Sequence, residues 1–170
     1  GGDPDAVVLI ASMPGFEGDH DGNKAAATED FPMPAIVMPS GSACGGPLSV
    51  PNGTVVLDLS DPASSCYSSI DVGGSGKVRI VGEGSLFLTG LSMQSGGQIT
   101  VEGEANIITN GVVSGLQGKL GVSGAGELKL YVSEQIQLGI QDTIGSDDAR
   151  KLAIFYSGTQ DVELGIQTNF

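Results

Sequence analysis

The sequence is poor in the residues on which most ligand chemistry depends. Its 170 residues include no tryptophan, one histidine and two cysteines, and only 5% are aromatic. Few rings argue against a platform on which sugars or bases stack. Seven basic against 20 acidic residues leave a net charge of −13, which repels nucleic acid and anionic membranes because both are bound through Lys and Arg. No apolar run is long enough to span a bilayer, so we expect no membrane insertion of this fragment.

The two cysteines, Cys44 and Cys66, are not arranged as a Cys-x-x-Cys motif. The single histidine, His20, is too far from either in sequence to suggest a zinc site. In an extracytoplasmic protein we expect the two cysteines to form a disulfide. In a reducing compartment they would be unrelated buried thiols.

Glycine, in contrast, is abundant, with 28 residues. Most of the eight prolines precede residue 54. The frequency of glycine and proline excludes long helices and predicts many turns. The stretch "FPMPAIVMPSGSACGGP" (31–47) should be extended and irregular, because proline lacks an N–H group and biases the preceding residue away from helix. We therefore expect residues 1–53 to be an irregular, proline-rich amino-terminal arm or cap.

From about residue 54 the sequence repeats with a period of 21 residues. Apolar residues recur at this spacing, as do glycines, and the columns are Val78, Ile99 and Leu120; Ile80, Val101 and Val122; Leu86, Ile107 and Leu128; Gly76, Gly97 and Gly118; and Gly82, Gly103 and Gly124. Within each unit the apolar residues alternate with polar ones, as in strands with one buried face. A unit of this length cannot bury its own apolar edge, so the units must stack.

The repeat predicts an all-β, single-domain fold over residues 54–170, a parallel β-helix or β-solenoid with circuits of about 21 residues and glycines at the corners. Residues 53–60 and 68–74 look like an earlier, degenerate circuit. Past residue 130 the circuits lengthen, with Leu138 and Leu164 now 26 residues apart, and we expect "TIGSDDAR" (143–150) to be a corner loop that absorbs extra residues.

Three stretches, "CYSSIDVGGSG" (66–76), "LKLYV" (128–132) and "KLAIFYSGTQDVEL" (151–164), carry a resemblance to a known family. Over residues 31–170 the chain resembles a bacterial β-solenoid domain of PilX-type, type IV pilus-associated proteins and related surface proteins. The resemblance implies a right-handed parallel β-helix displayed outside the cytoplasm, often behind a pilin-like stem. It implies no enzymatic activity.

The stretch "GDHDGN" (18–23) suggests a calcium loop. Asp19, Asp21 and Asn23 alternate as oxygen ligands do, and Asp30 falls at the twelfth position. Lys24 stands where such a loop needs a sharp-turn glycine, so the match is partial. The alternatives are a calcium site and a solvated turn, and we expect no other cofactor.

Two pairs of residues at equivalent positions of neighbouring circuits are candidates for function. Glu83 and Glu104 should lie side by side, and could serve acid–base chemistry on a polysaccharide or simply be solvent-facing charges. Phe87 and Ile108 should point outward with Lys129 next in the column. They are either covered by the amino-terminal arm or form, with Phe170 at the end of the chain, a surface for a partner.

Together these patterns predict a non-catalytic structural, display or adhesion module at the extracellular surface of a bacterium. Its partners would be other pilus or surface proteins or a surface ligand of a host, with end-to-end self-association through open strand edges. The alternatives are a carbohydrate-active β-helix enzyme acting on acidic polysaccharide and a cytoplasmic polymer scaffold of the bactofilin type.

Overall fold

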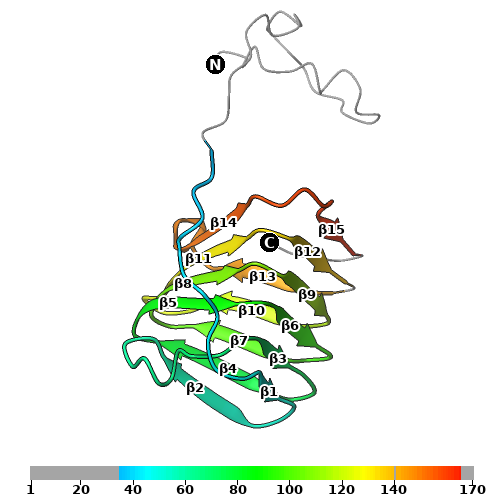
Figure 1. Ribbon diagram of the computed structural model, residues 1–170. Coiled ribbons are helices and arrows are strands. Elements are labelled where there is room, and N and C mark those ends of the chain that lie inside the picture. Colours follow the sequence, from blue (N-terminus) through cyan, green and yellow to red (C-terminus); the bar gives the residue numbers. More distant parts are fainter. Residues whose placement is uncertain (1–34, 140, 166–170) are drawn as a thin grey trace, which may run out of the picture. The chain divides into compact units, whose positions relative to one another are not determined.

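A computed structural model describes residues 35–139 and 141–165, of which residues from Ile36 onward belong to one compact unit (Figure 1). The described strands form three parallel sheets, here called A, B and C. In the order of their pairing, sheet A contains β1 (Leu48–Val50), β3 (Ile70–Val72), β6 (Leu91–Gln94), β9 (Val112–Leu116), β12 (Gln135–Leu138) and β15 (Glu163–Leu164). Sheet B contains β2 (Thr54–Asp58), β4 (Lys77–Val81), β7 (Gln98–Val101), β10 (Lys119–Val122) and β13 (Thr143–Ser146). Sheet C contains β5 (Glu83–Leu88), β8 (Glu104–Thr109), β11 (Glu127–Val132) and β14 (Leu152–Tyr156).

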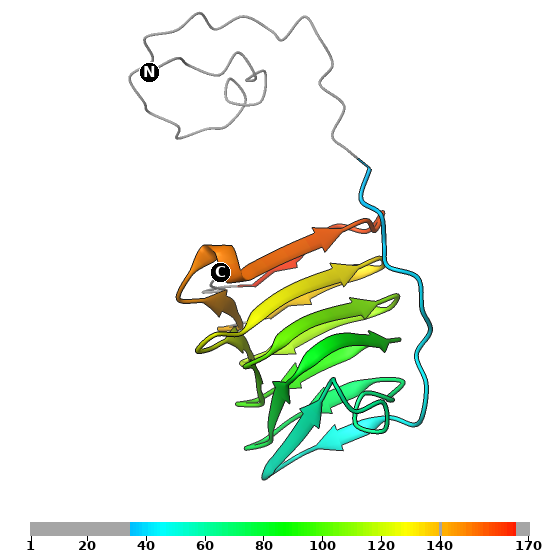
Figure 2. The same cartoon turned by 90° about the vertical axis from the view of Figure 1, so that its left-hand side faces the viewer.

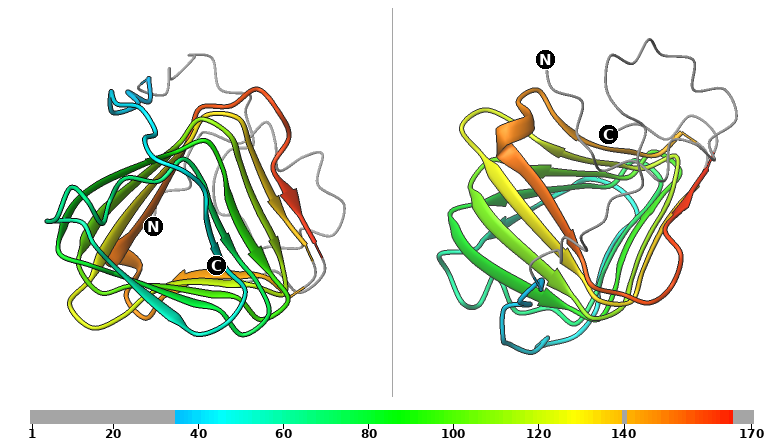
Figure 3. Two further views of the ribbon diagram at one scale, coloured as in Figure 1. Left: turned by 60° about the horizontal axis from the view of Figure 1, so that its bottom comes forward. Right: turned by 90° about the horizontal axis from the view of Figure 1, so that it is seen from above.

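The chain visits the three sheets in turn and then stacks the next coil on the last. Each strand pairs in parallel with the strand one coil earlier and the strand one coil later, so the fold is the β-solenoid that the repeat predicts. Seen along the stack, the three sheets are the sides of a triangle (Figure 3). This geometry follows from the alternation in the sequence, because every second side chain points to the inside.

The interior is built from the predicted apolar columns. Val78, Ile99 and Leu120 are consecutive partners across β4, β7 and β10, and all three are fully buried. The neighbouring column of Ile80, Val101 and Val122 is also buried. Burial of each such side chain contributes about 1.5–3 kcal/mol, and that gain is available only when coils stack.

Corner glycines serve two different purposes. Gly82 and Gly124 have φ of 73° and 62°, a left-handed conformation that glycine adopts without strain. Gly103 is needed for space, because a side chain there would clash with the backbone of Gly82 in the coil below. The corner glycines therefore permit both the turn and the close stacking of coils.

The 21-residue period fails at one corner, and the prediction for the third circuit of sheet C was wrong by two residues. Ile107 pairs with Leu130 and not with Leu128. The cause is the corner Ser123–Gly126, which is longer than its counterpart Glu102–Gly103 in the coil below. The shift keeps the parity of the strand, so the interior stays apolar while the outward columns change their members.

Both ends of the stack extend the predicted solenoid. β1 pairs with β3, so pairing begins at Leu48, within the span predicted as the irregular arm. At the other end Thr143–Ser146, expected in a corner loop, is strand β13 of sheet B, and a short 3-10 helix, η2 (Ala149–Lys151), forms the actual corner. The predicted 26-residue spacing is confirmed, because Leu138 pairs with Leu164.

Candidate functional site

The outer face of sheet C carries both predicted pairs, Glu83 with Glu104 and Phe87 with Ile108. The segment from Ile36 to Pro47, here called the strap, passes the carboxyl ends of the sheet C strands on its way to β1 (Figure 2). At Gly41 the backbone of the strap lies so near the ring of Phe87 that a side chain at this position would overlap the ring. The strap thus covers the start of an apolar column.

That apolar column is longer than the sequence predicted. Phe87 pairs with Ile108, Ile108 with Tyr131, and Tyr131 with Phe155. Tyr131, not Lys129, follows Ile108, because of the two extra residues at the preceding corner. The rings of Tyr131 and Phe155 stack with centroids 4.6 Å apart and planes inclined by 13°, a geometry that stabilises neighbouring coils. Ile108 is buried, and the three aromatic residues are half-buried.

A disulfide fixes the strap to the first coil. The sulfur atoms of Cys44 and Cys66 are at bonding distance, and their Cα atoms lie 5.0 Å apart, within the usual range for a disulfide. Cys66 lies in the loop Leu59–Ser69, which occupies the place of a sheet C strand below β5. The loop is held there by hydrogen bonds in which Leu59 N–H donates to Val81 O (2.9 Å) and Thr89 N–H to Ser68 O (2.7 Å). The disulfide thus joins the strap to the loop of the first coil.

A second outward column on sheet C is acidic. Glu83 pairs with Glu104, as predicted, and Glu104 pairs with Glu127, which the 21-residue spacing missed. Alignment on the Gly-Glu dipeptides 103–104 and 126–127 would have found the third glutamate. The glutamates line a shallow polar groove of about 220 Å³, together with Asn106 and Lys129. Adjacent strands put equivalent residues about 4.8 Å apart, so the three glutamates follow one another in a row along the groove.

A bidentate ion pair joins strand β4 of sheet B to Glu102, which lies at the corner between β7 and β8. Arg79 on β4 donates from Nε to Oε1 of Glu102 (2.8 Å) and from a terminal nitrogen to Oε2 (2.6 Å). The hydrogen bonds from Arg79 hold the pKa of Glu102 below its ordinary value of 4.5. The same hydrogen bonds raise the pKa of Arg79. A planar fork of this kind fixes orientation better than a lysine would.

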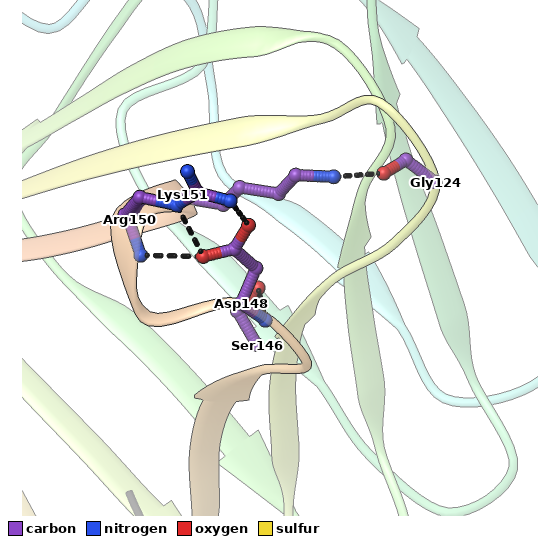
Figure 4. Close-up of polar contacts among 5 residues, drawn as sticks. All are labelled: Gly124, Ser146, Asp148, Arg150 and Lys151. Atoms are coloured by element: carbon purple, nitrogen blue, oxygen red, sulfur yellow. Dashed lines mark hydrogen bonds and ion pairs between the residues drawn. The ribbon is translucent and has the colours of Figure 1, made fainter.

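The corner between β13 and β14 is organised by Asp148 (Figure 4). The Asp148 carboxylate accepts from the N–H of Arg150 (3.0 Å) and from its guanidinium (3.0 and 2.8 Å), and these bonds lower the pKa of Asp148. Lys151 Nζ then donates to Gly124 O, 2.5 Å away in the coil below. These contacts pin η2 over the longer corner at 123–126 and orient the start of β14.

One carboxylate lies inside the described part of the stack, and no sequence pattern indicated it. Asp142 is fully buried where sheets A and B meet, and it accepts from Gly118 N–H (2.7 Å) and Gly139 N–H (2.6 Å). A side chain at Gly115 would overlap its carboxylate. Asp142 therefore satisfies backbone donors at a corner that no apolar residue could satisfy.

The candidate calcium ligands Asp19, Asp21, Asn23 and Asp30 lie outside the described residues, as does Phe170. Within the described part of the chain, no group of three or more His, Cys, Asp or Glu side chains is arranged to hold a metal ion. No helix there is long and apolar enough to cross a membrane. Comparison with known protein families, curated proteins and solved structures finds no match for the chain.

Proposed function

We propose that the chain is a non-catalytic structural module, displayed outside the cytoplasm on a bacterial surface and used for display or adhesion. The observation that carries the proposal is the disulfide between Cys44 and Cys66, which joins the strap to the first coil. A structural disulfide of this kind persists in oxidising compartments and is rare in the cytosol. The resemblance to PilX-type, pilus-associated domains supports the same location.

The three-sided stack suits such a role physically. Its stability comes from ladders and an apolar interior, so the outer faces are free to vary without disturbing the fold. The outer face of sheet C presents the apolar column that begins under the strap, and the acidic column, which is separated from it by the column of Ser85, Asn106 and Lys129. Partners would be other pilus or surface proteins, or a ligand on a host surface.

The location is tested with antibodies raised against the folded chain and applied to cells of the native host. Intact cells should be labelled as strongly as permeabilised ones, and the isolated protein should contain no thiol that reacts before reduction. Labelling that requires permeabilisation, together with two reactive thiols, would contradict the proposal and favour the cytoplasmic scaffold of the bactofilin type.

A carbohydrate-active enzyme is the second candidate, and the pairing of Glu83 with Glu104 favours it. The strand spacing of about 4.8 Å is near the carboxyl separation of about 5 Å in retaining glycosidases. Incubation with acidic polysaccharides, read as new reducing or unsaturated ends, tests this candidate. Activity that is lost in the Glu83→Gln, Glu104→Gln double variant but kept in Glu134→Gln would replace the structural proposal.

A further inference from the structure

The carboxyl-terminal end of the solenoid differs from the amino-terminal end. Leu152, Ile154 and Tyr156 of β14 stand above Leu128, Leu130 and Val132, which are fully buried. The residues of β14 continue the same inward columns, yet they are only half-buried. The apolar interior is therefore incompletely covered at this end, where β13, β14 and β15 are the outermost described strands of their sheets.

The edge strand of sheet A at the amino-terminal end is protected from edge pairing, whereas the edge strand of sheet C at the other end is not. At the amino-terminal end, edge strand β1 lies between Pro47 and Pro51, and proline cannot donate to an added strand. All eight prolines of the chain lie at or before Pro62. β14 reads Leu-Ala-Ile-Phe-Tyr, with no charge, proline or glycine, which is the composition of a strand that pairs readily.

The free hydrogen-bonding groups of β14 belong to its inward residues. Ser157 N–H donates to Val132 O (3.0 Å), and in a parallel ladder alternate residues bond to the same neighbour. Ala153 and Phe155 therefore bond to β11, while the N–H and C=O groups of Leu152, Ile154 and Tyr156 point to the open edge. An added strand would meet these three residues.

We propose that two copies of this chain join through β14, antiparallel across a two-fold axis at Ile154. In this register Ile154 faces Ile154 of the second copy and Leu152 faces its Tyr156, so every free group of β14 meets a free group of the second copy. Inward residues face inward residues, which makes the two apolar interiors continuous. On the outer face Ala153 lies opposite the second copy's Phe155, so a small side chain accommodates a large one.

The other two edges fit the same rotation. The chain passes through β13, β14 and β15 in turn. Each strand lies about a third of a coil further along the stack axis than the one before it, so at this end β15 projects furthest along the axis and β13 least. A two-fold axis through sheet C exchanges the positions of sheets A and B. When the two β14 strands lie one strand spacing apart, about 4.8 Å, β13 of each copy also lies one strand spacing from β15 of the other copy. The interface is isologous and closed, so it gives a dimer and not a filament.

The test compares the 170-residue chain with two variants by sedimentation over a range of concentrations. The native chain should approach twice its monomer mass of 17.1 kDa as concentration rises. Ile154→Lys places two like charges face to face and should weaken association by about 100-fold or more. Val56→Lys, the matched change on edge strand β2 of the opposite end, should leave association unchanged, because Val56 is already 49% exposed there. A native chain that stays monomeric, or a dimer that survives Ile154→Lys, overturns the proposal.

Amide hydrogen exchange on the native chain gives a readout that does not depend on the folding of a variant. The N–H of Ile154 should become protected as concentration rises, while the N–H of Phe155, bonded to β11 in one copy as in two, should be protected throughout. Association without protection at Ile154 would place the contact elsewhere, at the strap or the amino-terminal end, and overturn the proposal. The test is independent of where in the cell the protein acts.

Discussion

At the scale of single residues, Asp142 shows how one side chain closes a corner of the stack. It is fully buried, and each of its carboxylate oxygens accepts a backbone N–H, from Gly118 in one coil and Gly139 in the next. Removing the carboxylate leaves the buried N–H of Gly118 unsatisfied, which costs more than the hydrogen bond gains in folding. The N–H of Gly139 would keep a second acceptor, Gly115 O at 2.8 Å.

We therefore predict that Asp142→Ala lowers the free energy of unfolding by about 1–3 kcal/mol, the cost of leaving the Gly118 N–H unsatisfied. Asp142→Asn should lower the free energy of unfolding by a smaller but still measurable amount than Asp142→Ala, because its amide nitrogen would face an N–H donor. Urea unfolding measures the differences, with Asp147→Asn, an exposed carboxylate at the next corner of the chain, as control. An Asp142→Ala variant as stable as the control would show that water replaces the carboxylate.

The ion pair between Arg79 and Glu102 should make the stability of the folded chain depend on pH in the acidic range. The Glu102 pKa is lower in the folded chain than its ordinary value of 4.5, chiefly through the hydrogen bonds from Arg79. The folded state therefore gains stability above pH 4.5, and the gain disappears as pH falls through the lowered pKa. Arg79→Gln should thus be less stable than the native chain near neutral pH, and the difference should vanish once the pH is below the lowered Glu102 pKa.

The measurement is the free energy of unfolding as a function of pH. Lys77→Gln is the matched control, since it removes an exposed cation from the same strand. Both side chains of the Arg79–Glu102 pair are partly exposed, so added salt should reduce the difference at neutral pH. A difference between native and Arg79→Gln that persists unchanged into acid would refute the assignment to Glu102.

At the scale of elements, the strap depends on its disulfide. Without the bond between Cys44 and Cys66, the strap is held to the first coil mainly by contacts such as that of Gly41 with Phe87 and the hydrogen bond from Ser68 N–H to Gly46 O (3.1 Å). On the chain-entropy account, closing a loop of this size stabilises by about 3 kcal/mol.

We predict that replacing Cys44 and Cys66 by serine lowers the free energy of unfolding by about 3 kcal/mol. It should also speed amide exchange in the strap, while amides of the central coils remain protected. Reductant provides the internal control, because it should bring the native chain to the stability of the variant and leave the variant unchanged. Loss of protection throughout sheet C would mean that the strap is required for the fold and not merely fixed to it.

Elements also show where the sequence could and could not predict the structure. The columns of Val78, Ile99 and Leu120 were predictable because burial imposes their spacing. The column of Leu86 and Ile107 was continued to Leu128 instead of Leu130, because solvent-exposed corners accept insertions that apolar periodicity cannot detect. The same insertion concealed Glu127 from the acidic column and Tyr131 from the apolar one. Asp142 could not be predicted, because its role depends on which backbone donors the corner leaves unpaired.

At the scale of the whole molecule, the stack behaves as a one-dimensional array in which each coil contacts only its neighbours. Gly82 and Gly103 occupy equivalent places at successive corners, as the pairing of Glu83 with Glu104 shows. Deleting residues 82–102 therefore joins Val81 to Gly103 at the same corner and removes one complete coil. The inward columns on both sides of the deletion remain in register, so β10 can pair with β4 where it paired with β7.

We predict that this shortened chain folds into a solenoid with one coil fewer, with parallel β structure retained and a lower free energy of unfolding, because one interface between coils is lost. Circular dichroism and denaturant unfolding measure both. Deleting residues 92–102 is the control, since it removes only part of a coil, leaves sheet B without a strand at that level and should prevent cooperative folding. If both deletions abolished folding, contacts beyond nearest neighbours would be essential. If the partial deletion folded as well as the complete one, stability would not depend on the alignment of the inward columns.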